Sequence, residues 1–192
     1  MTIDLRLNAI VDPERAGGRD LAELARLTAL GGATLIQLRD KISDTRAMVE
    51  TARAIKEALK PFEVPLVVND RVDVALAAGA DGVHVGQDDM AVEDARKILG
   101  RGAIIGLSVK TVDEANAAPV ELIDYVGSGG VYVTTSKQQK SAPIGTAGLA
   151  KGLTLNAAVR EAKAYNSAAI AAAATDGKAV GRGPVHHFQQ WW

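Results

Sequence analysis

Strand-like and helix-like patterns alternate about six times along the first 130 residues, and this alternation is the feature that most constrains the fold. Short runs rich in valine, such as 66–68 and 82–85, fit buried strands, whereas apolar residues at helical spacing recur between them. Alternating strands and helices favour a parallel sheet whose strands are joined by helical crossovers. The sequence therefore predicts an α/β fold.

The expected strands are short and apolar, and the expected helices carry apolar residues three or four positions apart. Strands are expected at 5–11, 34–41, 65–70, 82–85, 103–108 and around 124–126 and 131–133, and helices at 21–28, 48–59, 72–78, 92–99 and 111–118. Asp44 is a suitable N-cap for the second helix, and Gly31, Pro61 and Gly79 end the first three. The segments 29–34 and 76–81 repeat one pattern, in which glycine ends a helix and an alanine and a polar residue enter the next strand.

Composition excludes several classes of function. The 22 Lys and Arg residues nearly balance the 23 Asp and Glu residues, so net charge indicates neither a nucleic-acid nor a membrane partner. The absence of cysteine excludes disulfides and thiolate metal sites. The N-terminus lacks a signal-peptide pattern and no apolar run approaches membrane-spanning length, so a cytoplasmic protein is expected. A homo-oligomer is left open.

At least five of the expected strands end in polar residues. This distribution distinguishes a closed barrel from an open sheet, the two folds that a βα repeat can form. A barrel places chemistry at the C-terminal end of every strand, whereas an open sheet places it at one switch point. The polar strand ends are Gln37, Arg39 and Lys41; Asn69 and Asp70; Gln87 and Asp89; Ser108; and Thr134, Ser136 and Lys137. No glycine fingerprint follows the first strand. The prediction is a TIM-type (β/α)8 barrel.

The residue types at these strand ends suit a phosphorylated ligand and a hard cation. In an extended strand Gln37, Arg39 and Lys41 share one face, where two cations can hold a multiply charged anion. Asp70 and Asp89 beside these cations suggest Mg²⁺, which prefers one or two carboxylates together with water and phosphate oxygens. Asp70 alone could instead cap the helix that follows it. His84 lies between valines and fits a satisfied interior residue better than a ligand.

Five motifs follow one another along the chain: 37–41 (QLRDK), 68–71 (VNDR), 79–89 (GADGVHVGQDD), 106–108 (GLS) and 134–137 (TTSK). In order and spacing they resemble the motifs of the thiamine phosphate synthase family, also called thiamine-phosphate pyrophosphorylase. The resemblance covers about three quarters of the chain, from about residue 5 to residue 149. The resemblance implies a transferase of thiamine biosynthesis with a barrel fold and Mg²⁺ as cofactor. Its small-molecule substrates would be hydroxymethylpyrimidine diphosphate and thiazole phosphate, which give thiamine phosphate and pyrophosphate.

The resemblance also implies a role for each matching residue. Gln37, Arg39, Lys41 and Asn69 would hold the pyrimidine diphosphate, and Asp70 and Asp89 would bind Mg²⁺. Ser108 would contact the pyrimidine substrate, Lys137 the pyrophosphate, and Thr134 and Ser136 the thiazole phosphate. The catalytic group would comprise Arg39, Lys41, Ser108 and Lys137, with no general base, because the family is thought to ionise the pyrimidine before the thiazole attacks.

The last quarter of the chain departs from the family pattern. Residues 1–150 are assigned to barrel units one to six, and residues 151–192 to a divergent segment with an alanine-rich helix followed by a poorly ordered tail. The last two βα units are thus expected to be divergent or incomplete. Two other functions remain open at this point. They are a thiazole tautomerase of similar fold, which needs no metal, and a phosphate-binding barrel without turnover.

Overall fold

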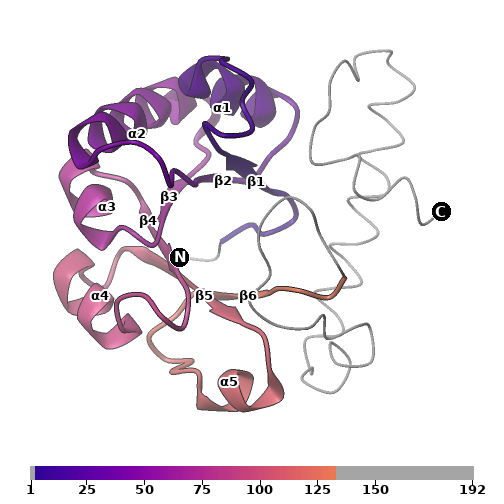
Figure 1. The fold of residues 1–192 in the computed structure, drawn as a ribbon, viewed down its shortest axis with the longest axis vertical. Helices are drawn as coiled ribbons and strands as arrows, with labels where there is room; N and C mark the ends of the chain where they lie inside the picture. Colours follow the sequence, from indigo (N-terminus) through magenta and orange to yellow (C-terminus); the bar gives the residue numbers. More distant parts are fainter. Residues whose placement is uncertain (1–2, 133–192) are drawn as a thin grey trace. The chain divides into compact units, whose positions relative to one another are not determined.

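A computed structural model describes residues 3–132 of the 192-residue chain. Within them, six parallel strands form one sheet in the order of the sequence. The strands are β1 (Asn8–Val11), β2 (Leu35–Leu38), β3 (Leu66–Asn69), β4 (Gly82–Val85), β5 (Ile104–Val109) and β6 (Tyr125–Ser128). Figure 1 shows them following an arc from β1 to β6. The described part of the chain is therefore a half-barrel of α/β type.

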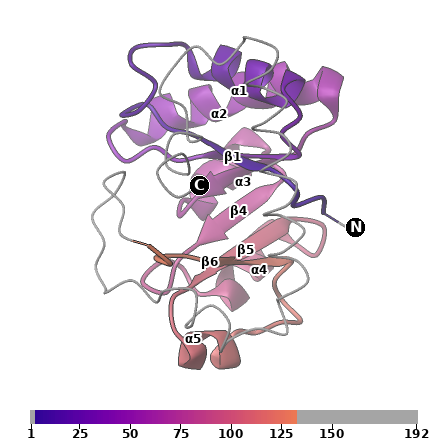
Figure 2. The same ribbon diagram turned by 90° about the vertical axis from the view of Figure 1, so that its right-hand side faces the viewer.

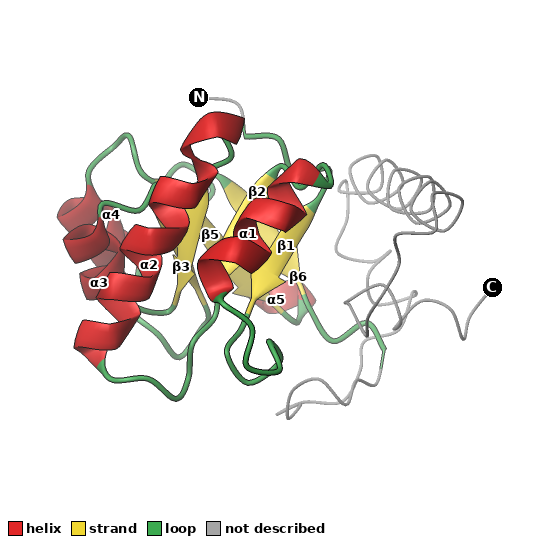
Figure 3. Ribbon diagram, turned by 90° about the horizontal axis from the view of Figure 1, so that it is seen from above, coloured by secondary structure: helices red, strands yellow, loops and turns green. Residues whose placement is uncertain are grey.

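The helices lie on the convex side of this arc (Figures 1 and 3). They are α1 (Leu21–Leu30), α2 (Thr45–Leu59), α3 (Val72–Ala78), α4 (Val92–Leu99) and α5 (Val112–Ala117), with the 3-10 turn η1 (Lys60–Phe62) after α2. The Asp44 carboxylate caps α2 by accepting the Ala47 N–H at 2.9 Å, as predicted. Gly79 ends α3 with a φ of 66°, a left-handed conformation that glycine adopts without steric cost.

Alternate residues of each strand pack on opposite faces of the sheet. Ile36 and Leu38 of β2 point to the helices, where Met48, Ile55 and Leu59 of α2 are buried in the same cluster. The concave face carries a second cluster, formed by Leu35, Val67, Ile104 and Tyr125. Figure 2 is turned so that the concave side faces the viewer, and the labelled strands β1, β4, β5 and β6 follow one another from top to bottom. Gln37 follows the phase of Leu35, so it lies on the concave face, as the alternation predicts.

The repeated pattern before β2 and β4 has a structural role at the N-terminal edge of the sheet. Thr34 Oγ1 accepts the Leu7 N–H at 3.0 Å, and an Asp81 oxygen accepts the Leu66 N–H at 2.8 Å. Asp124, before β6, accepts the Ile105 N–H at 2.8 Å in the same way. Through these hydrogen bonds, the residues that precede β2, β4 and β6 each contact the start of the preceding strand. They thereby satisfy backbone N–H groups at the beginnings of β1, β3 and β5.

The predicted elements agree with the structure, with differences at their ends. The first strand begins at Asn8 rather than residue 5, and β2 ends at Leu38 because Asp40 turns the chain. Residues 131–132 form a bend rather than a strand. Among residues 3–132, no helix is both long enough and apolar enough to cross a membrane.

Candidate active site

The candidate site lies at the C-terminal edge of the parallel sheet. Because all six strands run in the same direction, the polar residues that follow β2, β3 and β4 meet at one edge, together with Ser108 near the end of β5. The described site residues are Gln37, Arg39, Lys41, Asn69, Asp70, Asp89 and Ser108. Thr134, Ser136 and Lys137 lie outside the described residues.

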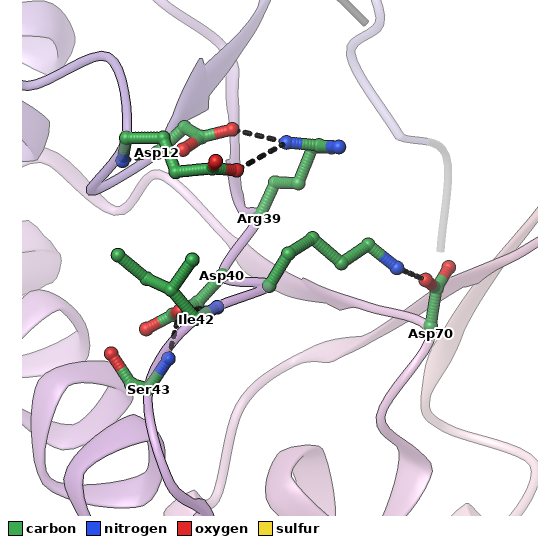
Figure 4. A network of polar contacts seen from close by, with 8 residues as sticks. Asp12, Arg39, Asp40, Ile42, Ser43 and Asp70 are labelled. Atoms are coloured by element: carbon green, nitrogen blue, oxygen red, sulfur yellow. Dashed lines mark hydrogen bonds and ion pairs between the residues drawn. The ribbon is translucent and has the colours of Figure 1, made fainter. Parts of the chain in front are cut away.

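Arg39 is held by carboxylates from the loop after β1. Its guanidinium forms an ion pair with Asp12, whose side chain is 7% exposed, and lies 3.8 Å from a Glu14 oxygen. Asp12 also accepts the Glu14 N–H at 2.8 Å, which fixes the turn. Figure 4 shows Arg39 directed at Asp12 and away from Asp70. The sequence pattern missed Asp12, which directly follows the strand expected at 5–11.

Asp40 shapes the loop that presents Lys41. Its carboxylate is buried and accepts the N–H groups of Ile42 at 3.0 Å and Ser43 at 2.9 Å (Figure 4). Burial acts to raise the pKa of Asp40, but these hydrogen bonds outweigh it and leave the pKa below its usual value. A charged Asp40 thus closes the turn between β2 and α2, and Lys41 projects from that turn.

Lys41 forms an ion pair with Asp70 across the ends of β2 and β3. Asp70 has a left-handed backbone conformation, with a φ of 63°, and its N–H donates to the His84 carbonyl at 2.7 Å. A non-glycine residue in this conformation is uncommon and frequently marks a functional position. The alternative that Asp70 caps α3 is wrong, because the first turn of α3 has no side-chain cap.

Asp89 completes a pair of carboxylates with Asp70. One Asp89 oxygen accepts the Gly86 N–H at 2.7 Å. Burial raises the pKa of Asp89; the Gly86 hydrogen bond opposes this, and a hydrogen bond and charge repulsion from Asp70 reinforce it, so the pKa lies above its ordinary value. Two neighbouring carboxylates of this kind favour either a shared proton or a cation.

The donor set at this pair fits a hard divalent cation. Residues 3–132 contain no group of three or more acidic or histidine side chains placed to hold a metal ion. Two carboxylates leave most coordination positions to water or to a ligand's oxygens, which is the arrangement that Mg²⁺ accepts. Lys41 lies beside the same pair of carboxylates, where its ammonium group can contact an anion.

A buried polar cluster lies next to this edge on the concave face. His84 of β4, 9% exposed, contacts the Tyr125 hydroxyl through Nδ1 at 2.9 Å and the Ser108 hydroxyl through Nε2 at 2.8 Å. Burial raises the pKa of Tyr125, and a side-chain interaction with Gln37 opposes this shift. His84 is thus the satisfied interior residue that the sequence predicted, whereas Tyr125 was missed because it was interpreted only as part of a strand.

A parallel half-barrel with cations and carboxylates at its C-terminal edge defines an α/β protein built from βα units, with its candidate site where the strands end. The chain belongs to the thiamine monophosphate synthase family (TMP-TENI), whose sequence model matches residues 7–182.

Individual relatives agree with this assignment. The chain is 52% identical over 159 residues to a thiamine-phosphate synthase of Agrobacterium fabrum, covering 83% of this chain and 71% of the relative. It is 41% identical over 181 residues to a thiamine-phosphate synthase of Moorella thermoacetica, covering 91% and 85%. Among solved structures it resembles thiamine phosphate pyrophosphorylase from Pyrococcus furiosus, with a TM-score of 0.68 and 35% identity over 79% of this chain and 73% of that one.

Proposed function

We propose that the chain is a transferase that joins hydroxymethylpyrimidine diphosphate to thiazole phosphate, giving thiamine phosphate and pyrophosphate. The observation that carries this proposal is the meeting of Lys41, Asp70 and Asp89 from three successive βα units. Family membership and the identities with named thiamine-phosphate synthases support the same reaction.

The reaction needs little acid or base chemistry from the protein. The carbon–oxygen bond to the diphosphate breaks, pyrophosphate leaves with the bonding electrons, and the thiazole nitrogen forms the new bond to the pyrimidine's methylene carbon. The barrier therefore depends on stabilising charge on the leaving group and on positioning the nucleophile. Cations at the edge of the sheet suit this task better than a general base would.

Individual residues take the following roles in the proposal. Arg39 and Lys41 bind the diphosphate oxygens together with Lys137, and Gln37 and Asn69 hold the pyrimidine diphosphate. Ser108 contacts the pyrimidine, and Thr134 and Ser136 bind the thiazole phosphate. Asp12 fixes the Arg39 guanidinium, so that little side-chain freedom is lost when substrate binds.

Asp70 and Asp89 hold Mg²⁺ in this proposal. When bound, the ion neutralises the charge that develops on the leaving pyrophosphate. The protein supplies the two carboxylates, and Lys41 exchanges its contact with Asp70 for a diphosphate oxygen. The carboxylate pair also favours this reaction over a tautomerisation, which needs no metal.

We further propose that the half-barrel belongs to a TIM-type (β/α)8 barrel, which the family match through residue 182 supports. A boundary near residue 150, a divergent segment over 151–192, a cytoplasmic location and a homo-oligomer remain predictions from the sequence.

Release of pyrophosphate from the purified chain tests the function. With both substrates and Mg²⁺, the wild-type protein should release pyrophosphate, and Asp89→Ala should abolish the release. Asp88→Ala is the matched control, because Asp88 is an exposed acidic neighbour outside the proposed metal pair. It should retain most of the wild-type rate. Folded wild-type protein that releases no pyrophosphate above background would remove the proposal.

A further inference from the structure

A series of side-chain hydrogen bonds crosses the concave face of the sheet and ends at Ser108. The hydroxyl of Tyr125 on β6 bonds His84 Nδ1 on β4 at 2.9 Å. His84 Nε2 then bonds Ser108 Oγ on β5 at 2.8 Å. Three strands thus contribute one side chain each to a buried polar network, which we call the His84 relay.

The direction of the proton donors in this relay depends on the tautomer of His84. Burial raises the pKa of Tyr125, so the phenol keeps its proton and has one O–H to donate. In one of the two neutral tautomers of His84, this O–H donates to Nδ1. A neutral imidazole that accepts at Nδ1 carries its proton at Nε2, so it donates to Ser108 Oγ.

Glycines on β5 and β6 leave room for the imidazole in this position. A Cβ at Gly106 would lie 2.5 Å from His84 Nδ1, and a Cβ at Gly127 would lie 3.0 Å from His84 Cε1. The ring occupies the space that these two missing side chains leave. It is also almost fully buried, so it cannot turn away from Ser108 without disturbing the core.

We propose that His84 and Tyr125 are positioning residues that fix the Ser108 hydroxyl as a hydrogen-bond donor toward the substrate. Ser108 accepts from His84, so its own O–H points elsewhere. The substrate atom that meets it must then be an acceptor, such as a ring nitrogen or a phosphate oxygen. This inference rests on the function proposed above, in which Ser108 contacts the pyrimidine.

A double-mutant cycle distinguishes positioning from a purely structural role. Tyr125→Phe keeps the ring and removes the hydroxyl, and it should lower kcat/KM for the pyrimidine diphosphate about tenfold. In a Ser108→Ala background the same change should cost less than about twofold, because the group through which it acts is gone. Equal losses in the two backgrounds would overturn the proposal.

Thr28→Val is the matched control for loss of a hydroxyl. Thr28 donates to the Leu24 carbonyl at 2.6 Å within α1, on the convex side and away from the site. Its kcat/KM should equal that of the wild type. Circular dichroism and thermal unfolding should show that each variant is folded before rates are compared.

Nuclear magnetic resonance tests the relay without turnover. The imidazole nitrogen shifts of His84, assigned by their loss in His84→Gln, should show a neutral ring with the proton on Nε2. Tyr125→Phe should move this ring toward a mixture of tautomers. A proton on Nδ1 in the wild type would overturn the relay. If the wild type released no pyrophosphate, the proposed function would fail. The nitrogen shifts of His84 would still show whether the relay exists.

Discussion

Gly106→Ala tests how tightly the concave face is packed. Gly106 lies on β5 in register with His84 on one side and Tyr125 on the other. An added Cβ would lie 2.1 Å from Tyr125 Cζ and 2.5 Å from both Tyr125 Oη and His84 Nδ1, whereas ordinary contacts are 3.4–4 Å. The tyrosine or the strand must therefore move by more than about 1 Å.

The expected loss of stability follows from these contacts. Overpacking of a buried site costs about 1–3 kcal/mol. Separating Tyr125 from His84 costs about 1 kcal/mol more for the hydrogen bond. Together they predict a free energy of unfolding lower by about 2–4 kcal/mol and a Tm lower by roughly 4–16 °C.

Urea denaturation of Gly106→Ala and Gly102→Ala measures this effect. Gly102 lies between α4 and β5, and a Cβ there would meet nothing within 4 Å. Its substitution should change the free energy of unfolding by less than about 0.5 kcal/mol. If Gly106→Ala were as stable as Gly102→Ala, the packing of Tyr125 and His84 over β5 would be refuted.

Further predictions concern the charged groups. Asp12→Ala leaves the mostly buried Arg39 guanidinium without its main partner and should lower the free energy of unfolding by about 2 kcal/mol in urea titrations. Asp4→Ala, which breaks an exposed ion pair with Arg6, should cost less than about 1 kcal/mol; equal costs would contradict the burial of the first pair. Because the pKa of Asp89 is raised above 3.8, protons compete with the cation, so calorimetry should show Mg²⁺ affinity falling as the pH drops through that raised pKa. In the metal-free protein the folded state binds this proton more tightly than the unfolded chain does, so stability should decrease as the pH rises from 3.8 through the folded pKa. Asp89→Asn should remove both pH dependences, and their persistence would contradict the assignment to Asp89.

Local sequence signals predicted most of the described fold. The strand at 82–85 and the helices at 72–78 and 92–99 have the predicted bounds, because glycine or a change of period marks both ends. The Asp44 cap was predictable for the same reason, since the side chain bonds a backbone group three residues away.

Contacts between distant segments were harder to predict. Arg39 is 27 residues from Asp12, and His84 is 41 residues from Tyr125, so neither pair has a local signature. A polar residue at the end of the first strand was the available signal for Asp12. For Tyr125, the signal was a large aromatic residue on one expected strand, next to another expected strand that contains a glycine. Both signals need the register of the sheet, which a single sequence does not supply.

Binding of inorganic pyrophosphate tests most directly whether the charged residues at the C-terminal edge of the sheet form a magnesium–diphosphate site. Calorimetric titration should show pyrophosphate binding at least about tenfold more tightly with Mg²⁺ than without it, because Asp70 and Asp89 would hold the ion and its charge would attract the anion. Asp89→Ala should lose this gain. Equal affinity with and without Mg²⁺, or a gain that survives Asp89→Ala, would contradict a magnesium–diphosphate site formed by these residues.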